Sequence, residues 1–233
     1  KQKLPFLLIA LIVVTACLTP ELQAATPTPA STQLPIATPV LEAPGILTVC
    51  LGQEPNTLYP FGELNAAARS VLAAIYEGPF DTVSYEYQPV ILSQTPSLEN
   101  GDAQIVKITV QAGSQVVSAD GSLVSLSEGL RVRPADCRND DCAIVYDGVG
   151  SVEMDQMVVI FRLRPDLTWS DGTPLTSDDS IYSFELAKDS QATGNSYVID
   201  RTQTYEAADE KTVQWWGIPG FIDSSYFTNF WTP

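Results

Sequence analysis

The clearest alternation of apolar and polar positions in the chain runs from Met157 to Arg164. Every second residue from Met157 to Leu163 is apolar, and the intervening positions end in two arginines. A period of two is typical of a strand that buries one face, because successive side chains point to opposite sides. We therefore expect a strand here, at one edge of a sheet.

Turn residues follow this strand and separate it from the next apolar segment. The stretches Arg164–Asp166 and Ser170–Gly172 both favour turns. Proline fixes its own φ, and Asp-Gly joins a side-chain acceptor to a residue that tolerates positive φ. Trp169 lies between the two turns and is expected to anchor the loop by packing.

A helix is expected to begin at Thr176, directly after this loop. Asp178 and Asp179 place negative charge in its first turn, where the helix dipole favours it. We interpret both carboxylates as capping groups and not as a catalytic acid pair, because adjacent residues in a helix point in different directions. The apolar face of the helix is expected to consist of Ile181, Phe184 and Leu186.

The same signals predict the other elements of the chain. Asn65 is expected to cap a helix that covers Ala66–Glu77. Aromatic residues crowd the tail between Gly217 and Trp231, which we expect either to join the core or to line a ligand site. The remaining expected elements are a short strand over Ile46–Leu51 that is buried on both faces, a strand over Ile105–Val110, hairpins between Gln115 and Asp147, and a strand after a turn at Asp209–Glu210.

The first sixteen residues have the pattern of an export signal. Lys1 and Lys3 precede the apolar run Leu4–Val14, which is short for a bilayer span and has the length of a signal-peptide core. The tetrapeptide Val14–Cys17 resembles a bacterial lipobox, which implies cleavage before Cys17 and lipidation of its thiol. A cleaved signal with an unmodified cysteine, or a single membrane anchor, is the alternative.

The segment after the signal is rich in threonine and proline, and its prolines prevent a helix or a strand ladder from propagating. We expect it to be an extended tether. The expected organisation is thus a lipoprotein signal peptide (residues 1–16), a tether (17–45) and a folded domain (46–233).

Charge and composition narrow the classes of function. The 233 residues include 12 basic and 28 acidic side chains, giving a formal net charge of −16, and no histidine. Such an acidic chain does not neutralise phosphates, so nucleic acid is not an expected partner. The absence of histidine removes the commonest general base and most zinc sites. We expect no enzymatic activity, no metal site and no cofactor.

The cysteines predict one disulfide. Cys137 and Cys142 lie close together in the predicted hairpin region. In an exported protein, two such cysteines favour a disulfide that closes a small loop. A metal site would need more soft ligands than the chain supplies. Cys50 has no evident partner.

Three motifs of the chain together resemble one protein family. They are W-S-D-G-T-P with the following T-S-D-D and Y-S-F (Trp169–Phe184), Q-E-P-N-T-L (Gln53–Leu58) and Y-E-G (Tyr76–Gly78). Their order is similar to that in the family 5 extracellular solute-binding proteins, the oligopeptide and dipeptide receptors of ABC importers. Ser180 stands where the family usually has a hydrophobic residue, which predicts weaker packing of this helix on the sheet.

The resemblance implies an α/β fold of the periplasmic-binding-protein-like type II class with a mixed sheet. Members of the family are longer than this chain and fold into two lobes with the ligand between them. We therefore interpret residues 46–233 as an N-terminal fragment, the first part of lobe I only, enlarged by an inserted β-hairpin region.

The resemblance also implies a function. It predicts a monomeric receptor outside the cytoplasm, anchored to the cell membrane by its lipid, that captures a solute, expected to be an oligopeptide, and delivers it to ABC permease subunits. Two alternatives stay open: a secreted glycoside hydrolase that uses two carboxylates, and a surface scaffold lipoprotein without a transport role. The residues that the resemblance places at the ligand cleft are Phe61, Glu63, Leu64, Asn65, Tyr197, Trp215 and Trp216.

Overall fold

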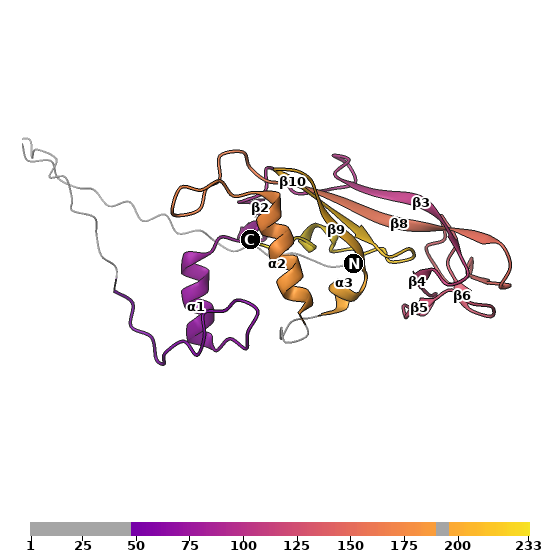
Figure 1. The fold of residues 1–233 in the computed structure, drawn as a ribbon, viewed down its shortest axis with the longest axis horizontal. Coiled ribbons are helices and arrows are strands. Elements are labelled where there is room, and N and C mark those ends of the chain that lie inside the picture. The colour runs from indigo at the N-terminus through magenta and orange to yellow at the C-terminus, as the bar shows by residue number, and fades with distance from the viewer. Residues whose placement is uncertain (1–47, 190–195) are drawn as a thin grey trace, which may run out of the picture. The chain divides into compact units, whose positions relative to one another are not determined.

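The computed structural model describes residues 48–189 and 196–233 of the chain (Figure 1). By their internal contacts, residues Val49–Pro233 form one compact unit. The predicted signal peptide (1–16), the lipidation site Cys17 and the predicted tether (17–45) lie outside the described residues and stay predictions. In the described part of the chain, no helix combines the length and the apolar character needed to cross a membrane.

A four-stranded sheet with the strand order β3-β8-β10-β9 forms the centre of this unit. Its strands are β3 (Ala103–Gln111), β8 (Ser151–Arg162), β9 (Thr202–Asp209) and β10 (Thr212–Gly217). The alternation in the sequence correctly predicts a strand, but β8 lies inside the sheet between β3 and β10 (Figure 1). The expectation of an edge strand is therefore wrong, because the alternation reports burial of a face and carries no information about the neighbouring strands.

The helices and the sheet together confirm the expected α/β class. All strand pairs among the described residues are antiparallel, so the parallel component of the expected mixed sheet is not found there. The connection between β9 and β10 shows why. A turn at Glu210–Lys211, close to the predicted position, returns the chain directly, and two strands joined by so short a turn must run in opposite directions.

One face of the sheet forms the main hydrophobic core. Val159 of β8 pairs with Ala103 of β3 on one side and with Trp215 of β10 on the other, and all three side chains are buried. Residues that lie opposite one another in neighbouring strands point to the same face, which explains the continuous apolar layer. Helix α2 (Ser177–Lys188) contacts β9 and β10 and packs on this face (Figure 1).

Helix α2 packs on the sheet mainly through small polar side chains. Its buried residues are Ser177, Ser180, Ser183 and Phe184, whereas Ile181 and Leu186 are only partly buried. The expected apolar face is therefore correct only at Phe184. Serine at the other contact positions lets the helix approach closely and hydrogen-bond across the interface: the Ser177 hydroxyl donates to the Asp209 carbonyl at 2.5 Å.

The N-terminal part of the unit contains one helix and one hairpin. Helix α1 covers Ala66–Ile75, and the Asn65 side chain accepts a hydrogen bond from the Ala68 backbone N–H at 2.8 Å, as a capping residue does. Strands β1 (Phe80–Val83) and β2 (Glu86–Pro89) pair across a tight turn. The predicted helix and its cap are confirmed, with an end two residues earlier than expected.

The strand expected over Ile46–Leu51 is wrong for its described part. Residues 48–51 have no regular structure, and Val49 is 65% exposed. The apolar run therefore indicated burial that does not occur, because no neighbouring strand of the described chain pairs with it.

The insertion between β3 and β8 is a set of hairpins, as expected. Strand β4 (Gln115–Val117) pairs with β5 (Leu123–Ser125), and β6 (Arg131–Val132) pairs with β7 (Ile144–Val145). The insertion has a hydrophobic cluster of its own, formed by Val110, Val116, Leu126, Val132, Tyr146 and Met154. The structure contains a disulfide between Cys137 and Cys142 in this region, and Cys50 is an exposed free thiol.

The aromatic residues of the tail after β10 join the core, the first of the two roles considered for them. Phe221 and Phe230 are buried in the main core, on either side of the short 3-10 helix η1 (Tyr226–Thr228). Thr232 and Pro233 line cavities at the surface. The aromatic residues of the tail thus complete the core, and its last residues reach the candidate site.

Candidate functional site

Two adjoining surface cavities form the candidate site. The larger has a volume of about 820 Å³ and the smaller about 510 Å³. They are neighbours because Tyr76, Trp169, Thr232 and Pro233 line both. We call the two cavities together the groove.

The C-terminal half of helix α1 forms one wall of the groove. Leu72 is buried on the inner side of the helix, while Ile75 is 63% exposed and Tyr76 is 44% exposed. The backbone N–H of Tyr76 donates to the Leu72 carbonyl at 2.9 Å, which ends the helix and directs the chain toward Glu77. Apolar side chains that a helix would normally bury are thus presented to the cavities.

The loop between β8 and α2 forms the opposite wall and carries Trp169. The Trp169 backbone N–H donates to the Thr173 carbonyl at 2.8 Å, and the Gly172 backbone N–H donates to the Trp169 carbonyl at 2.9 Å. Asp171 accepts from the Thr173 backbone N–H and hydroxyl, and these bonds lower the pKa of Asp171. The predicted turn therefore holds Trp169 in place, and Trp169 packs on the edge of the core as expected.

Helix α2 contributes a third side through Asp179, Tyr182, Ser183 and Leu186. The Asp179 carboxylate accepts the backbone N–H of Thr176 at 2.7 Å and its hydroxyl at 3.1 Å. Asp178 is exposed on another side of the helix. The capping interpretation is therefore confirmed for Asp179, whereas Asp178 contributes only its charge to the first turn of the helix.

The charges at the groove are negative. Glu77 and Asp81 line the larger cavity and Asp179 lines the smaller, while no lysine or arginine of the described chain lines either. A cation whose charge interacts with Glu77 is Arg164, and its guanidinium pairs with Asp166 at 2.9 Å. The hydrogen bond with Asp166 is the main reason that the pKa of Arg164 is raised, with a smaller contribution from the charge of Glu77.

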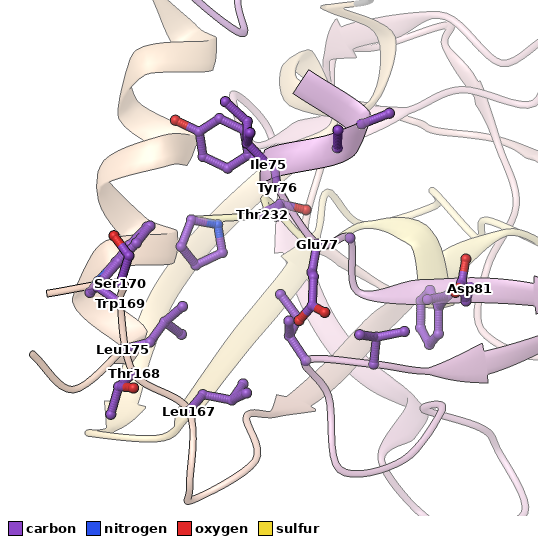
Figure 2. Close-up of a pocket in the computed structure, with 17 residues that line it drawn as sticks. Ile75, Tyr76, Glu77, Asp81, Leu167, Thr168, Trp169, Ser170, Leu175 and Thr232 are labelled. Atoms are coloured by element: carbon purple, nitrogen blue, oxygen red, sulfur yellow. The ribbon is translucent and has the colours of Figure 1, made fainter. Parts of the chain in front are cut away.

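Figure 2 shows how the larger cavity is arranged. The Glu77 side chain extends into the space between the loop that carries Trp169 and Leu175 and the strand that carries Asp81. Thr168 and Ser170 place hydroxyl groups on the same wall as Trp169. The cavity thus combines carboxylates and hydroxyls with an aromatic wall.

Of the residues expected at the cleft, Phe61 alone lines the groove. Asn65 is occupied as the cap of α1, and its amide donates to the Glu54 carbonyl at 2.9 Å. Glu63 is exposed and Leu64 is partly buried, both outside the groove. Tyr197 belongs to α3 (Ser196–Asp200) and does not line either cavity. The guanidinium carbon of Arg201 lies 3.9 Å from the centre of the Tyr197 ring.

The two tryptophans of β10 do not line the groove either. Trp215 is completely buried, and its indole N–H donates to the Thr202 hydroxyl at 2.8 Å. The expectation that Trp215 faces a ligand is therefore wrong, since it is a core residue. Trp216 points to the opposite face of the sheet, as neighbouring strand residues do, and is partly buried there.

Only weak signals in the sequence point to the groove residues that were missed. Tyr76 belongs to the Y-E-G motif, and Trp169 was expected only as an anchor. Tyr182 lies in an exposed position of α2, and it is 65% exposed. Only the packing of α1 beside the loop after β8 brings these aromatic residues together.

Among the described residues, no group of three or more histidine, cysteine or acidic side chains is arranged to hold a metal ion. The groove chemistry is therefore that of aromatic walls, hydroxyls and carboxylates. Such a site can bind an organic ligand through apolar contacts and a few polar ones.

A comparison with protein-family sequence models agrees with the motifs of the chain. The sequence model described as "Bacterial extracellular solute-binding proteins, family 5 Middle" matches residues 147–215. Residues 147–215 are therefore similar to a part of that family, and we call them the family 5 segment. This family 5 segment runs from the end of the hairpin insertion through β8 and α2 to β10, and it includes Trp169 and Tyr182 of the groove.

Two further comparisons were made. No curated protein matches the chain in sequence. Among solved structures, it is similar to an oligopeptide-binding protein of Thermus thermophilus crystallised with a pentapeptide, with 16% identity and a TM-score of 0.40. The similarity covers 66% of this chain and 19% of that protein, so the chain spans less than a fifth of its length.

The family that this segment resembles consists of extracellular solute-binding proteins. The groove wall formed by the loop after β8 and by α2 belongs to this segment, whereas the wall formed by α1 lies before it in the chain.

Proposed function

We propose that this chain forms part of a receptor that captures an oligopeptide outside the cytoplasm and delivers it to the permease of an ABC importer. The observation that carries the proposal is the position of the groove. Trp169 and Tyr182 line it and lie within the family 5 segment, so the part of the chain with a solute-binding relationship is also the part that forms a cavity wall.

The groove has the size and lining of an organic-ligand site. Its cavities of about 820 and 510 Å³ fall within the range of about 300–1,000 Å³ that is usual for such sites. The smaller cavity is largely aromatic and aliphatic, and the larger adds carboxylates and hydroxyls to apolar walls. Apolar walls accept side chains of different shapes. A peptide suits them because its side chains fill successive cavities while its backbone supplies hydrogen-bonding groups.

In the proposed receptor, the described unit supplies one side of the binding site and a second lobe supplies the other. A ligand that contacts both lobes favours the closed state by the free energy of its contacts with the second lobe. The described unit by itself is therefore expected to bind the peptide more weakly than a complete two-lobed receptor.

Binding of peptides can be measured directly on the purified full chain. We expect mass spectrometry of material released by denaturation to detect short peptides, and calorimetry with a mixture of tri- to pentapeptides to detect binding. Trp169→Ala is expected to weaken this binding by about tenfold, because the indole lines both cavities.

Tyr85→Asn is the matched control for this variant. Tyr85 is a fully exposed aromatic residue outside the groove with a φ of 67°, a conformation that asparagine tolerates. Peptide binding by this variant is expected to be unchanged. The proposal is contradicted if no peptide is released and none binds.

The lipid anchor is a separate part of the proposal and rests on the lipobox motif. We expect cells that express the chain to incorporate labelled palmitate into it, and Cys17→Ser to abolish the label. Label that persists in Cys17→Ser would show that the lipid is attached to another residue, and no label in the unaltered chain would show that the anchor is absent.

Delivery to a permease distinguishes an import receptor from a surface scaffold. Crosslinking in native membranes is expected to join the chain to ABC permease subunits, and the crosslink is expected to increase when peptide is added. A chain that is recovered only with other surface proteins would favour the scaffold.

The hydrolase alternative has its own test. Chromogenic glycosides incubated with the chain are expected to stay intact, since turnover would favour the hydrolase.

A further inference from the structure

We infer that the groove recognises a ligand through two unlike subsites: the larger cavity takes a cationic side chain, and the smaller takes an aromatic or large aliphatic one. The ligand class is therefore a peptide in which lysine or arginine stands beside an apolar residue. This inference rests on the proposed function and adds a substrate preference to it.

The larger cavity is suited to a positive charge. Among the described residues, the carboxylates of Glu77 and Asp81 have no ion-pair or hydrogen-bond partner, and no described lysine or arginine lines the cavity. Arg164 interacts electrostatically with Glu77, but its guanidinium is already paired with the carboxylate of Asp166. A cationic ligand group entering this cavity would therefore meet uncompensated negative charge.

The aromatic wall of the same cavity strengthens this preference. Trp169 and Tyr76 line this cavity together with Glu77. Figure 2 shows the Glu77 side chain between the loop that carries Trp169 and the strand that carries Asp81. A cation beside a carboxylate also gains from contact with the face of an aromatic ring. An anionic ligand group would be repelled at the same position.

The smaller cavity differs because its single carboxylate is already used. Asp179 accepts both the backbone N–H and the hydroxyl of Thr176, so it caps the helix and is not free for a ligand. The rest of the lining is mainly apolar, and the rings of Tyr59 and Phe61 meet edge to face at 5.8 Å. This environment favours an uncharged, apolar side chain.

The two subsites are close enough for neighbouring residues of one ligand. Tyr76 and Trp169 belong to the linings of both cavities and so form the partition between them. Two adjacent residues of an extended peptide are about 3.3–3.6 Å apart along the chain and point to different sides. A peptide that crosses the partition can place one side chain in each cavity.

The test uses calorimetry with the full chain and four tetrapeptides. They are Ala-Lys-Phe-Ala, Ala-Gln-Phe-Ala, Ala-Glu-Phe-Ala and Ala-Lys-Ser-Ala. We expect the Lys-Phe peptide to bind about tenfold more tightly than the Gln-Phe peptide, and the Glu-Phe peptide to bind least tightly. Raising the ionic strength is expected to lower the affinity for the Lys-Phe peptide more than that for the Gln-Phe peptide, because salt screens the attraction between charges.

Three variants assign the preferences to the subsites. Glu77→Gln is expected to reduce the preference for the Lys-Phe over the Gln-Phe peptide, and Glu77→Gln together with Asp81→Asn is expected to abolish it, because both carboxylates line the larger cavity. Tyr182→Ala is expected to reduce the Lys-Phe peptide to the affinity of the Lys-Ser peptide. Glu99 is an exposed acid outside both cavities, so Glu99→Gln changes the net charge as Glu77→Gln does without altering the groove. This control variant is expected to leave the preference for lysine intact.

The outcomes separate this inference from the proposed function. If all four peptides bind with similar affinity, or if the variant with both Glu77→Gln and Asp81→Asn retains the preference for lysine, the inference is wrong while peptide capture stands. If none of the four binds and a broad peptide mixture also gives no binding, both are wrong.

Discussion

The hydroxyl groups of Ser180 and Tyr205 lie 2.7 Å apart in the core, where helix α2 meets strand β9. The Ser180 hydroxyl also donates to the Trp231 carbonyl, and the Trp231 backbone N–H donates to the Tyr205 hydroxyl at 3.1 Å. Because Ser180 has only one hydrogen to donate, the Tyr205 hydroxyl must donate to Ser180, and the three groups form a closed ring. The ring joins the helix, the sheet and the tail.

This ring changes the expectation drawn from Ser180 in the sequence. A serine in place of a hydrophobic residue predicts weaker packing of the helix on the sheet, but Ser180 is completely buried. Its hydroxyl replaces apolar contact with hydrogen bonds to Tyr205 and Trp231, and Phe184 packs against both of their rings at 4.9 and 4.6 Å between ring centres. The attachment is therefore polar and aromatic.

We expect Ser180→Ala and Tyr205→Phe each to lower the free energy of unfolding by about 1–3 kcal/mol, because each leaves buried polar groups of the ring without a partner. The double variant is expected to lose less than the sum, since both substitutions break the same ring. Urea denaturation measures all three. Ser125→Ala, at an exposed position of β5, is the control; strict additivity would contradict the closed ring.

The stability of the fold is expected to fall at alkaline pH because of Tyr205. Burial raises the pKa of Tyr205, and the hydrogen bonds with Ser180 and Trp231 oppose this only in part. Above the ordinary tyrosine pKa of about 10, the unfolded chain has lost this proton while the folded chain retains it. The unfolded state then binds fewer protons, so the free energy of unfolding decreases as pH rises, by up to about 1.4 kcal/mol per pH unit.

Tyr205→Phe isolates this contribution from that of the other tyrosines. Urea denaturation of both proteins between about pH 9 and about pH 11 is expected to show a shallower decline for Tyr205→Phe. Parallel declines in the two proteins would mean that Tyr205 does not hold its proton in the folded state.

The two neighbouring acids of α2 are expected to differ in their effect on stability. Asp179→Ala removes the acceptor for the Thr176 backbone N–H and is expected to lower the free energy of unfolding by about 0.5–2 kcal/mol. Asp178→Ala removes an exposed charge from the same helical turn and is expected to cost less than about 0.5 kcal/mol. Thermal or urea unfolding compares them, and equal effects would show that only the charge matters.

Gly220 is expected to be the least replaceable glycine of the tail. It has a φ of +87°, and a Cβ atom there would lie 2.5 Å from the Val117 carbonyl oxygen and 2.8 Å from Met154. Gly220→Ala is therefore expected to cost more than about 3 kcal/mol, from backbone strain and the clash together. Gly101, with a φ of +79° and open space around it, isolates the strain alone.

Gly101→Ala is expected to cost about 1–2 kcal/mol. The comparison also tests whether the tail fastens the hairpin insertion to the sheet, since Gly220 N–H donates to the Asp155 carbonyl and Val117 N–H to the Pro219 carbonyl. Similar losses for both variants would show that the close approach at Gly220 is unimportant.

Local elements of the fold could be predicted from the sequence where the physical cause is itself local. The cap at Asn65, the helix starting after Thr176 and the turn at Ser170–Gly172 depend on side chains and backbone within a few residues. The strand around Val159 followed from its alternation. Its interior place in the sheet did not, because the neighbours of a strand are chosen by segments far away in the chain.

The candidate site was predicted less well, for the same reason. Trp215 was expected near a ligand as an aromatic residue in a family 5 context, but the register of β10 turns it into the core. Phe61 lines the groove, while Tyr76, Trp169 and Tyr182 were not expected to form one surface. An aromatic residue in a sequence is compatible with both fates, and only its neighbours in space decide between them.

The sequence by itself determined the family resemblance, the acidic character and the order of helices, turns and hairpins, because composition and short-range periodicity are properties of the chain. The tertiary structure decided which faces are buried and where a groove lies. It did so by bringing α1, the loop after β8 and the end of the tail together, which long-range packing controls and no local pattern records.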